Sequence, residues 1–135
     1  MLELLQSLNL WAVLTGTVAY FLLGALWYSL LFSKIWMKLR GIAEEDIGEP
    51  NPVIFLWTFL LQLIAVISLA LFLSAIPAET LIQGAVAGFG AGAGLVFTLS
   101  GTTGLFSNTS LGLHLVDNGY HVLGLTIAGM ILGAW

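Results

Sequence analysis

Four long apolar runs follow one another along the chain, and short polar segments separate them. The runs cover about residues 10–32, 53–76, 81–100 and 111–135, with a continuation of the third run to Phe106 left open. A helix needs about 20 apolar residues to cross a bilayer. Barrel strands would instead show about ten residues of alternating pattern. The pattern therefore predicts four transmembrane helices in a single membrane domain, residues 1–135.

The polar segments between the runs favour helix ends. Asn51 and Pro52 stand where the second run begins, and they suit an N-cap and a first helical turn. "SAIPAET" is short, so the second and third helices are predicted to form an antiparallel hairpin. "SGTTGLFSNTS" is expected to be a loop whose Asn108, Thr109 or Ser110 caps the fourth helix.

Every basic residue lies in the first connecting segment: Lys34, Lys38 and Arg40. Cytoplasmic loops are enriched in basic residues, so this segment is expected in the cytoplasm. Both termini and the turn at Pro77 are then expected outside. "FSKIWMKLRGI" predicts a short amphipathic helix at the membrane interface, with Trp36 and Met37 toward the lipid.

The composition agrees with a membrane protein and excludes several functions. The chain is 59% hydrophobic and 7% charged, whereas soluble domains hold about 25% charged residues. It has no cysteine, which excludes disulfides, thiol catalysis and thiolate metal sites. A net charge of -4 argues against nucleic acid as a partner. The N-terminal "MLELLQSLNLW" lacks a basic start and is not expected to be a cleaved signal peptide.

Glycines repeat at a spacing of four in the third run. Gly84, Gly88 and Gly92 share one helix face, and Gly90 and Gly94 lie on another. Glycine lets helix backbones approach closely, so we expect the third helix to be packed on two sides and therefore central. Close-approach positions in the first and fourth helices are expected at Gly16, Gly24, Gly129 and Gly133.

Polar residues gather on one face of the fourth run: His114, Asp117, Asn118 and His121. Ionisable side chains at membrane depth usually face the protein interior or water, and they often mark function. Three roles are open. The residues form a proton or ion relay, a divalent metal site, or hydrogen bonds that only hold helices together.

The structural role rests on local arguments. Asp117 lies early in its helix, where a carboxylate complements the helix dipole. His121 can bond Asp117 four residues back. A metal needs three or four ligands, so another helix or subunit would have to contribute. Gln62, in the middle of the second run, is expected to bond a neighbouring helix. Aromatic residues near the predicted helix ends are expected as interface anchors: Trp11, Trp27, Tyr28, Trp36, Trp57 and Trp135.

Two stretches, "LLGALWYSLLFSKIWMKLRGI" and "LVDNGYHVLGLTIAGMILGAW", resemble a family of small bacterial membrane proteins catalogued as domain of unknown function 1761. The matching positions are Gly24, Trp27, Tyr28, Ser29, Phe32, Trp36, Met37, Gly119, Tyr120, His121, Gly129 and Trp135. The resemblance implies four helices in a bacterial inner membrane, with no assigned activity. It also implies one site shared by Trp27, Tyr28, Asp117 and His121, with Tyr120 beside them. Family members often carry an acidic and a basic residue in the last loop, and "LFSNTSLGL" has neither.

The expected fold is an all-α bundle of four transmembrane helices, with both termini outside. Four helices fill their own interior, so we expect a homo-oligomer, with a dimer as the first case. The first functional hypothesis is translocation of a proton, ion or small solute along the polar face of the fourth run. The second is a non-catalytic accessory or scaffold subunit of a larger membrane complex, and the third is a metal-dependent membrane enzyme. No catalytic motif is present, so neither an enzyme nor a cofactor is expected.

Overall fold

The computed structural model describes residues 8–76 and 78–135, and this part of the chain is helical throughout its ordered elements. Four helical segments are long and apolar enough to cross a membrane: Leu10–Leu31, Pro52–Ala75, Leu81–Phe106 and Leu111–Ala134. The predicted all-α class and the four spanning helices are therefore confirmed. The expectations for the extreme N-terminus and for Pro77 concern residues outside the described part.

The spanning segments are built from both α-helix and π-helix. The first consists of α2 (Leu10–Leu26) and the π-helical turn η1 (Trp27–Leu31). Two short helices follow, α3 (Ser33–Arg40) and η2 (Glu44–Asp46). The second span is α4 (Pro52–Ala75). The third joins α5 (Leu81–Phe89), the π-helical η3 (Gly90–Val96) and α6 (Phe97–Phe106), and the fourth is α7 (Leu111–Ala134).

A short polar side chain caps the start of each span. The side chains of Asn9, Asn51, Thr80 and Ser110 each accept a hydrogen bond from a backbone N–H two or three residues further on. Of the three residues expected to cap the fourth helix, Ser110 does so. Caps of this kind stabilise a helix by about 1 kcal/mol.

The connection between the third and fourth spans is shorter than expected. The helix continues through "SGTTGLF" to Phe106, which leaves only residues 107–110 for the turn. The hydroxyl of Thr102 donates to the carbonyl of Thr98, and that of Thr103 donates to the carbonyl of Leu99. The hydroxyl groups of these threonines are hydrogen-bonded to the backbone of their own helix, so the helix can continue through this polar stretch.

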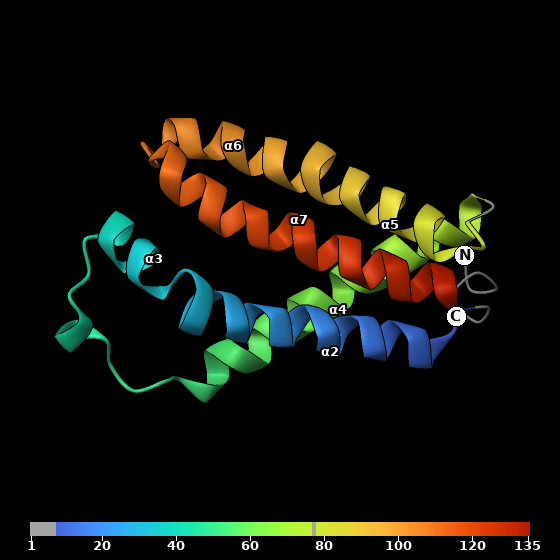
Figure 1. Cartoon of the computed structure of the whole chain (residues 1–135), viewed down its shortest axis with the longest axis horizontal. Coiled ribbons are helices and arrows are strands. Elements are labelled where there is room, and N and C mark those ends of the chain that lie inside the picture. The colour runs from blue at the N-terminus through green and yellow to red at the C-terminus, as the bar shows by residue number, and fades with distance from the viewer. Residues whose placement is uncertain (1–7, 77) are drawn as a thin grey trace.

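Helix α7 is the central element. It lies between α2 on one side and the third span on the other, and it also contacts α4 (Figure 1). The expectation that the third helix is central is wrong. Atoms added as Cβ at Gly90 or Gly94 would meet nothing within 4 Å, so that glycine face is open. Lipid tails are as apolar as a protein core, so a glycine face at this depth does not have to be covered by the same chain.

The third span packs on α7 through backbone contact. A Cβ added at Gly84 would overlap the carbonyl oxygen of Gly129, and one at Gly88 would overlap that of Leu125. A Cβ at Gly92 would lie 2.7 Å from the Cα of Val122. Side chains at these positions would therefore force the two helices apart.

The tightest packing lies where α2, α4 and α7 meet. Thr17, Val66 and Ala128 each have 0% of their surface exposed. Gly16 lies against two of them, because a Cβ there would be 3.4 Å from Val66 and 3.6 Å from Ala128. This apolar centre separates one end of the bundle from the other, and the polar residues of α7 lie on its α3 side.

Candidate functional site

Asp117 is held by two aromatic side chains. The hydroxyl of Tyr28 donates to its Oδ1 at 2.9 Å, and the indole N–H of Trp36 donates to the same oxygen at 3.0 Å. Tyr28 lies in the π-helical turn η1 and Trp36 lies in α3. Single π-helical turns occur frequently at functional sites. Two neighbouring elements, η1 and α3, thus converge on a carboxylate of α7, at least 81 residues later in the chain.

Trp27, Tyr28 and Trp36 point inward at this end of the bundle, which corrects two expectations. Trp27, expected as an interface anchor with Tyr28 and Trp36, donates its indole N–H to the carbonyl of Val116 at 3.0 Å. Met37, expected toward the lipid, is only 9% exposed. Helix α3 turns back against the start of α7 (Figure 1), so protein rather than lipid covers its apolar side.

His121 bonds across the bundle to Tyr20 of α2. Its Nδ1 lies 2.6 Å from the hydroxyl of Tyr20. Sequence reasoning offered a local pair with Asp117, one turn earlier on α7, but the described bond of the ring goes to the other helix. Gly124 makes room for this arrangement, because a Cβ there would overlap the ring of Tyr20.

Tyr120 lies between the Tyr20–His121 pair and the Tyr28–Asp117 pair. Its ring centroid is 5.3 Å from that of Tyr20, 5.5 Å from that of Tyr28 and 4.8 Å from that of His121. The amide of Gln62 donates to the Tyr120 hydroxyl, so Gln62 bonds a neighbouring helix as its mid-span position predicted. The Oε1 of Gln62 is buried and has no hydrogen-bond partner among residues 8–76 and 78–135. We call the following residues the Asp117 cluster: Tyr20, Tyr28, Trp36, Gln62, Asp117, Tyr120 and His121.

His114 and Asn118 lie on the part of the polar face of α7 that meets the third span. The amide nitrogen of Asn118 is 2.9 Å from Nδ1 of His114, and the hydroxyl of Ser100 donates to the amide oxygen of Asn118 at 2.5 Å. The ring of His114 meets that of Phe97 edge to face, with centroids 4.4 Å apart. The predicted polar face is therefore divided, because α7 is covered on both sides and each half of the face meets a different helix.

The division of the polar face weakens the hypothesis of a metal site. Within residues 8–76 and 78–135, no three His, Asp or Glu side chains are close enough together to hold a metal ion. Asp117 faces η1 and α3 and His121 faces α2, whereas His114 faces α6. A metal at this cluster would need ligands from outside the described part of the chain.

Two grooves border the central helix. One, of about 660 Å³, lies between α2 and α4, and it is lined by Phe21, Gly24, Ala25, Tyr28, Ser29, Ile54, Phe55, Thr58 and Tyr120. Two of its residues, Tyr28 and Tyr120, belong to the Asp117 cluster. It is called the tyrosine groove below.

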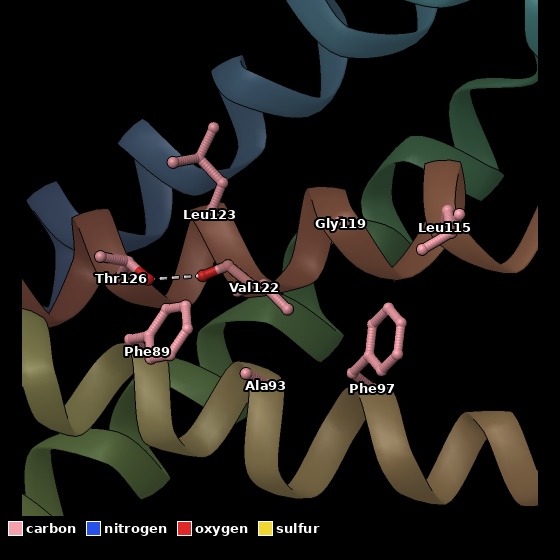
Figure 2. Close-up of a pocket in the computed structure, with 8 residues that line it drawn as sticks. All are labelled: Phe89, Ala93, Phe97, Leu115, Gly119, Val122, Leu123 and Thr126. Atoms are coloured by element: carbon pink, nitrogen blue, oxygen red, sulfur yellow. Dashed lines mark hydrogen bonds between the residues drawn. The ribbon is translucent and has the colours of Figure 1, made fainter.

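The second groove, of about 460 Å³, lies between the third span and α7, and Figure 2 shows its lining residues. Phe89, Ala93 and Phe97 come from the third span, and the others come from α7. The hydroxyl of Thr126 donates to the carbonyl of Val122 at 2.7 Å (Figure 2). The hydroxyl hydrogen of Thr126, the one polar side chain of this groove, is thus used within its own helix, and the other lining side chains are apolar.

Sequence reasoning missed three members of the arrangement: Tyr20, Trp36 and Ser100 as partners of the α7 polar residues. Tyr20 had a signal, since it lies between Gly16 and Gly24 on one stripe of the first helix. Trp36 and Ser100 had none, because nothing in the sequence shows that α3 packs against α7 or which face of the third span meets Asn118.

The chain belongs to the family described as Protein of unknown function (DUF1761), which matches residues 11–133. The resemblance found in the two sequence stretches is therefore confirmed over nearly the whole chain. The comparison with curated proteins found no match, and the comparison with solved structures also found none. The family carries no assigned activity, so a function has to be argued from the geometry.

Proposed function

We propose that this member of the family is a multi-pass protein of the bacterial inner membrane that moves protons, and that the Asp117 cluster is the site that carries them. The observation behind the proposal is the environment of Asp117 in a spanning helix. Both described hydrogen bonds to its carboxylate come from neutral donors, Tyr28 and Trp36. A charged carboxylate at membrane depth is costly and usually serves a function.

The groups of the cluster suit proton movement better than passage of a hydrated ion. A carboxylate, an imidazole and three phenols lie within hydrogen-bond or ring contact of one another. Each of these groups can hold or pass a proton without an open pore. The bundle centre beside them is filled by Val66 and Ala128, which leaves no space for a hydrated ion in one copy.

The orientation follows from the basic residues of α3. Lys34, Lys38 and Arg40 are exposed at the end of the bundle where Asp117 lies, and the guanidinium of Arg40 stands 5.2 Å from the ring of Trp36. By the positive-inside rule this end is cytoplasmic and both termini are outside. Asp117 follows Leu111 by six residues, so it lies about 9 Å along the helix from that end, and His121 lies one turn deeper.

A second copy is part of the proposal. The apolar centre interrupts the polar groups within one chain, so a homodimer is expected to complete the route. The open face of the third span supports this, because a Cβ added at Gly90 or Gly94 would meet nothing within 4 Å in the described part of the chain. Native mass spectrometry of the protein in mild detergent checks the dimer. A monomer, or a stable complex with another protein, would favour the accessory-subunit hypothesis instead.

Proton flux into liposomes that contain a pH-sensitive dye tests the function. The unaltered protein is expected to admit protons under a potassium diffusion potential, and Asp117→Asn is expected to reduce the rate by about tenfold or more. Ser100→Ala, on the other side of α7, is the matched control and is expected to keep the flux. Absence of flux from the unaltered protein, or full flux from Asp117→Asn, contradicts the proposal.

A further inference from the structure

The tyrosine groove has an unusual combination of aromatic rings and hydroxyl groups for a surface between two spanning helices. Its lining includes the rings of Phe21, Tyr28, Phe55 and Tyr120 and the hydroxyls of Ser29 and Thr58. We infer that this groove binds a lipophilic organic cation. The inference goes beyond the proposed function and does not depend on it, although the groove shares Tyr28 and Tyr120 with the Asp117 cluster.

The polar atoms of the groove are acceptors. Ser29 donates its hydroxyl hydrogen to the carbonyl of Ala25, and Thr58 donates its hydrogen to the carbonyl of Ile54. Tyr28 donates to Asp117, and Tyr120 points its hydroxyl to the carbonyl of Tyr20.

The hydroxyl oxygens then keep only lone pairs for a ligand. A ligand that needs a donor, such as a carboxylate or a phosphate, finds none among the groove's hydroxyls. A positively charged ligand finds several oxygens of the right polarity.

The carboxylate of Asp117 lies next to Tyr28, one of the aromatic residues that line the groove. The hydroxyl of Tyr28 bonds the carboxylate of Asp117, which draws electron density toward the phenol oxygen. The faces of aromatic rings attract cations by about 0.5–2 kcal/mol each, depending on how dry the site is.

The shape of the groove indicates how the ligand arrives. Ile54 is 61% exposed and Phe55 is 50% exposed, and both lie on α4 at the groove edge. In a spanning helix such side chains meet lipid, so a ligand enters sideways from the bilayer and has to be lipophilic. A volume of about 660 Å³ falls within the usual range for organic ligands of moderate size.

A pair of probes with the same shape and opposite charge tests the inference. Tetraphenylphosphonium is the cation and tetraphenylborate is the anion, and binding of each to the full chain in detergent is measured by equilibrium dialysis. The cation is expected to bind saturably and at least about tenfold more tightly than the anion. Equal or tighter binding of the anion overturns the inference.

Substitutions of groove residues test whether the cation binds in the groove. Ala25→Leu fills the groove from α2, and Thr58→Leu fills it from α4, so one variant serves if the other does not fold. Each is expected to weaken cation binding by about tenfold. Thr15→Leu, at an exposed position of α2 outside the groove, is the matched control and is expected to bind as before. Unchanged binding in a folded groove variant overturns the inference.

Two further results separate this inference from the others. Binding of the cation without proton flux would keep the groove site and remove the proposed proton movement, whereas flux without cation binding would do the reverse. Displacement of the cation by an equal concentration of phosphatidylethanolamine would assign the groove to lipid head groups and overturn the inference.

Discussion

The hydroxyl of Tyr20 lies 2.6 Å from Nδ1 of His121, a residue 101 positions later in the chain. This bond joins the first and last spans inside the bundle, where Tyr20 is only 2% exposed. Gly124, one turn after His121, is the position that admits the tyrosine ring. The pair is therefore both a contact between helices and a member of the proposed proton site.

Tyr20→Phe keeps the ring and removes the hydroxyl. His121 then loses its partner across the bundle, and the free energy of unfolding is expected to fall by about 1 kcal/mol. Thermal unfolding in detergent, followed by circular dichroism, measures the change. Tyr20→Phe in a His121→Phe background is expected to cost less than it does alone. Equal costs in the two backgrounds would show that the bond contributes nothing.

Substitutions of Asp117 separate its charge from its hydrogen bonds. Asp117→Asn keeps an oxygen for Tyr28 and Trp36, so stability is expected to change by less than about 1 kcal/mol. Asp117→Ala leaves both donors without a partner and is expected to cost about 2 kcal/mol or more. Thermal unfolding and proton flux are measured on the same preparations. A purely structural Asp117 would give an Asn variant with normal flux.

Glycines of the third span are expected to differ in their tolerance of alanine. Gly84→Ala places a Cβ against the backbone of Gly129, and the overpacking is expected to cost about 1–3 kcal/mol. Within one copy, the Cβ of Gly94→Ala meets nothing in the described part of the chain, so the variant is expected to be neutral or to stabilise the monomer by up to about 1 kcal/mol. Thermal unfolding of both variants gives the comparison. A reversed order would contradict the packing of the third span on α7.

Ser100→Ala tests the other side of α7. It removes the hydroxyl that donates to Asn118, so stability is expected to fall by about 1 kcal/mol. Because Ser100 does not touch the Asp117 cluster, proton flux corrected for the amount of folded protein is expected to stay unchanged. A large loss of flux would show that the two sides of α7 act together.

The chain has no cysteine, so single cysteines report its orientation without background. Lys38 in α3 and Glu79 before α5 are both exposed, and they lie at opposite ends of the bundle. An impermeant maleimide is expected to label Glu79→Cys in intact cells and to label Lys38→Cys only after the membrane is opened. The opposite result would invert the proposed orientation.

The sequence by itself determined the class and the span count. Runs of about 20 apolar residues can only be spanning helices, because lipid offers no partner to an open backbone. It also determined where α4 begins, because Asn51 is a favourable N-cap residue and Pro52 suits the first helical turn. The glycines at a spacing of four showed which face of the third span can approach another backbone closely.

Only the tertiary structure decided which helix is central and which aromatic residues face inward. In a soluble helix the polar side shows which face is outside, but here the outer face meets lipid and is as apolar as the core. The sequence could therefore not show that α7 is covered on two sides, or that Trp36 turns toward Asp117. The same cause split the predicted polar face, since His121 meets Tyr20 on one side of α7 while Asn118 meets Ser100 on the other.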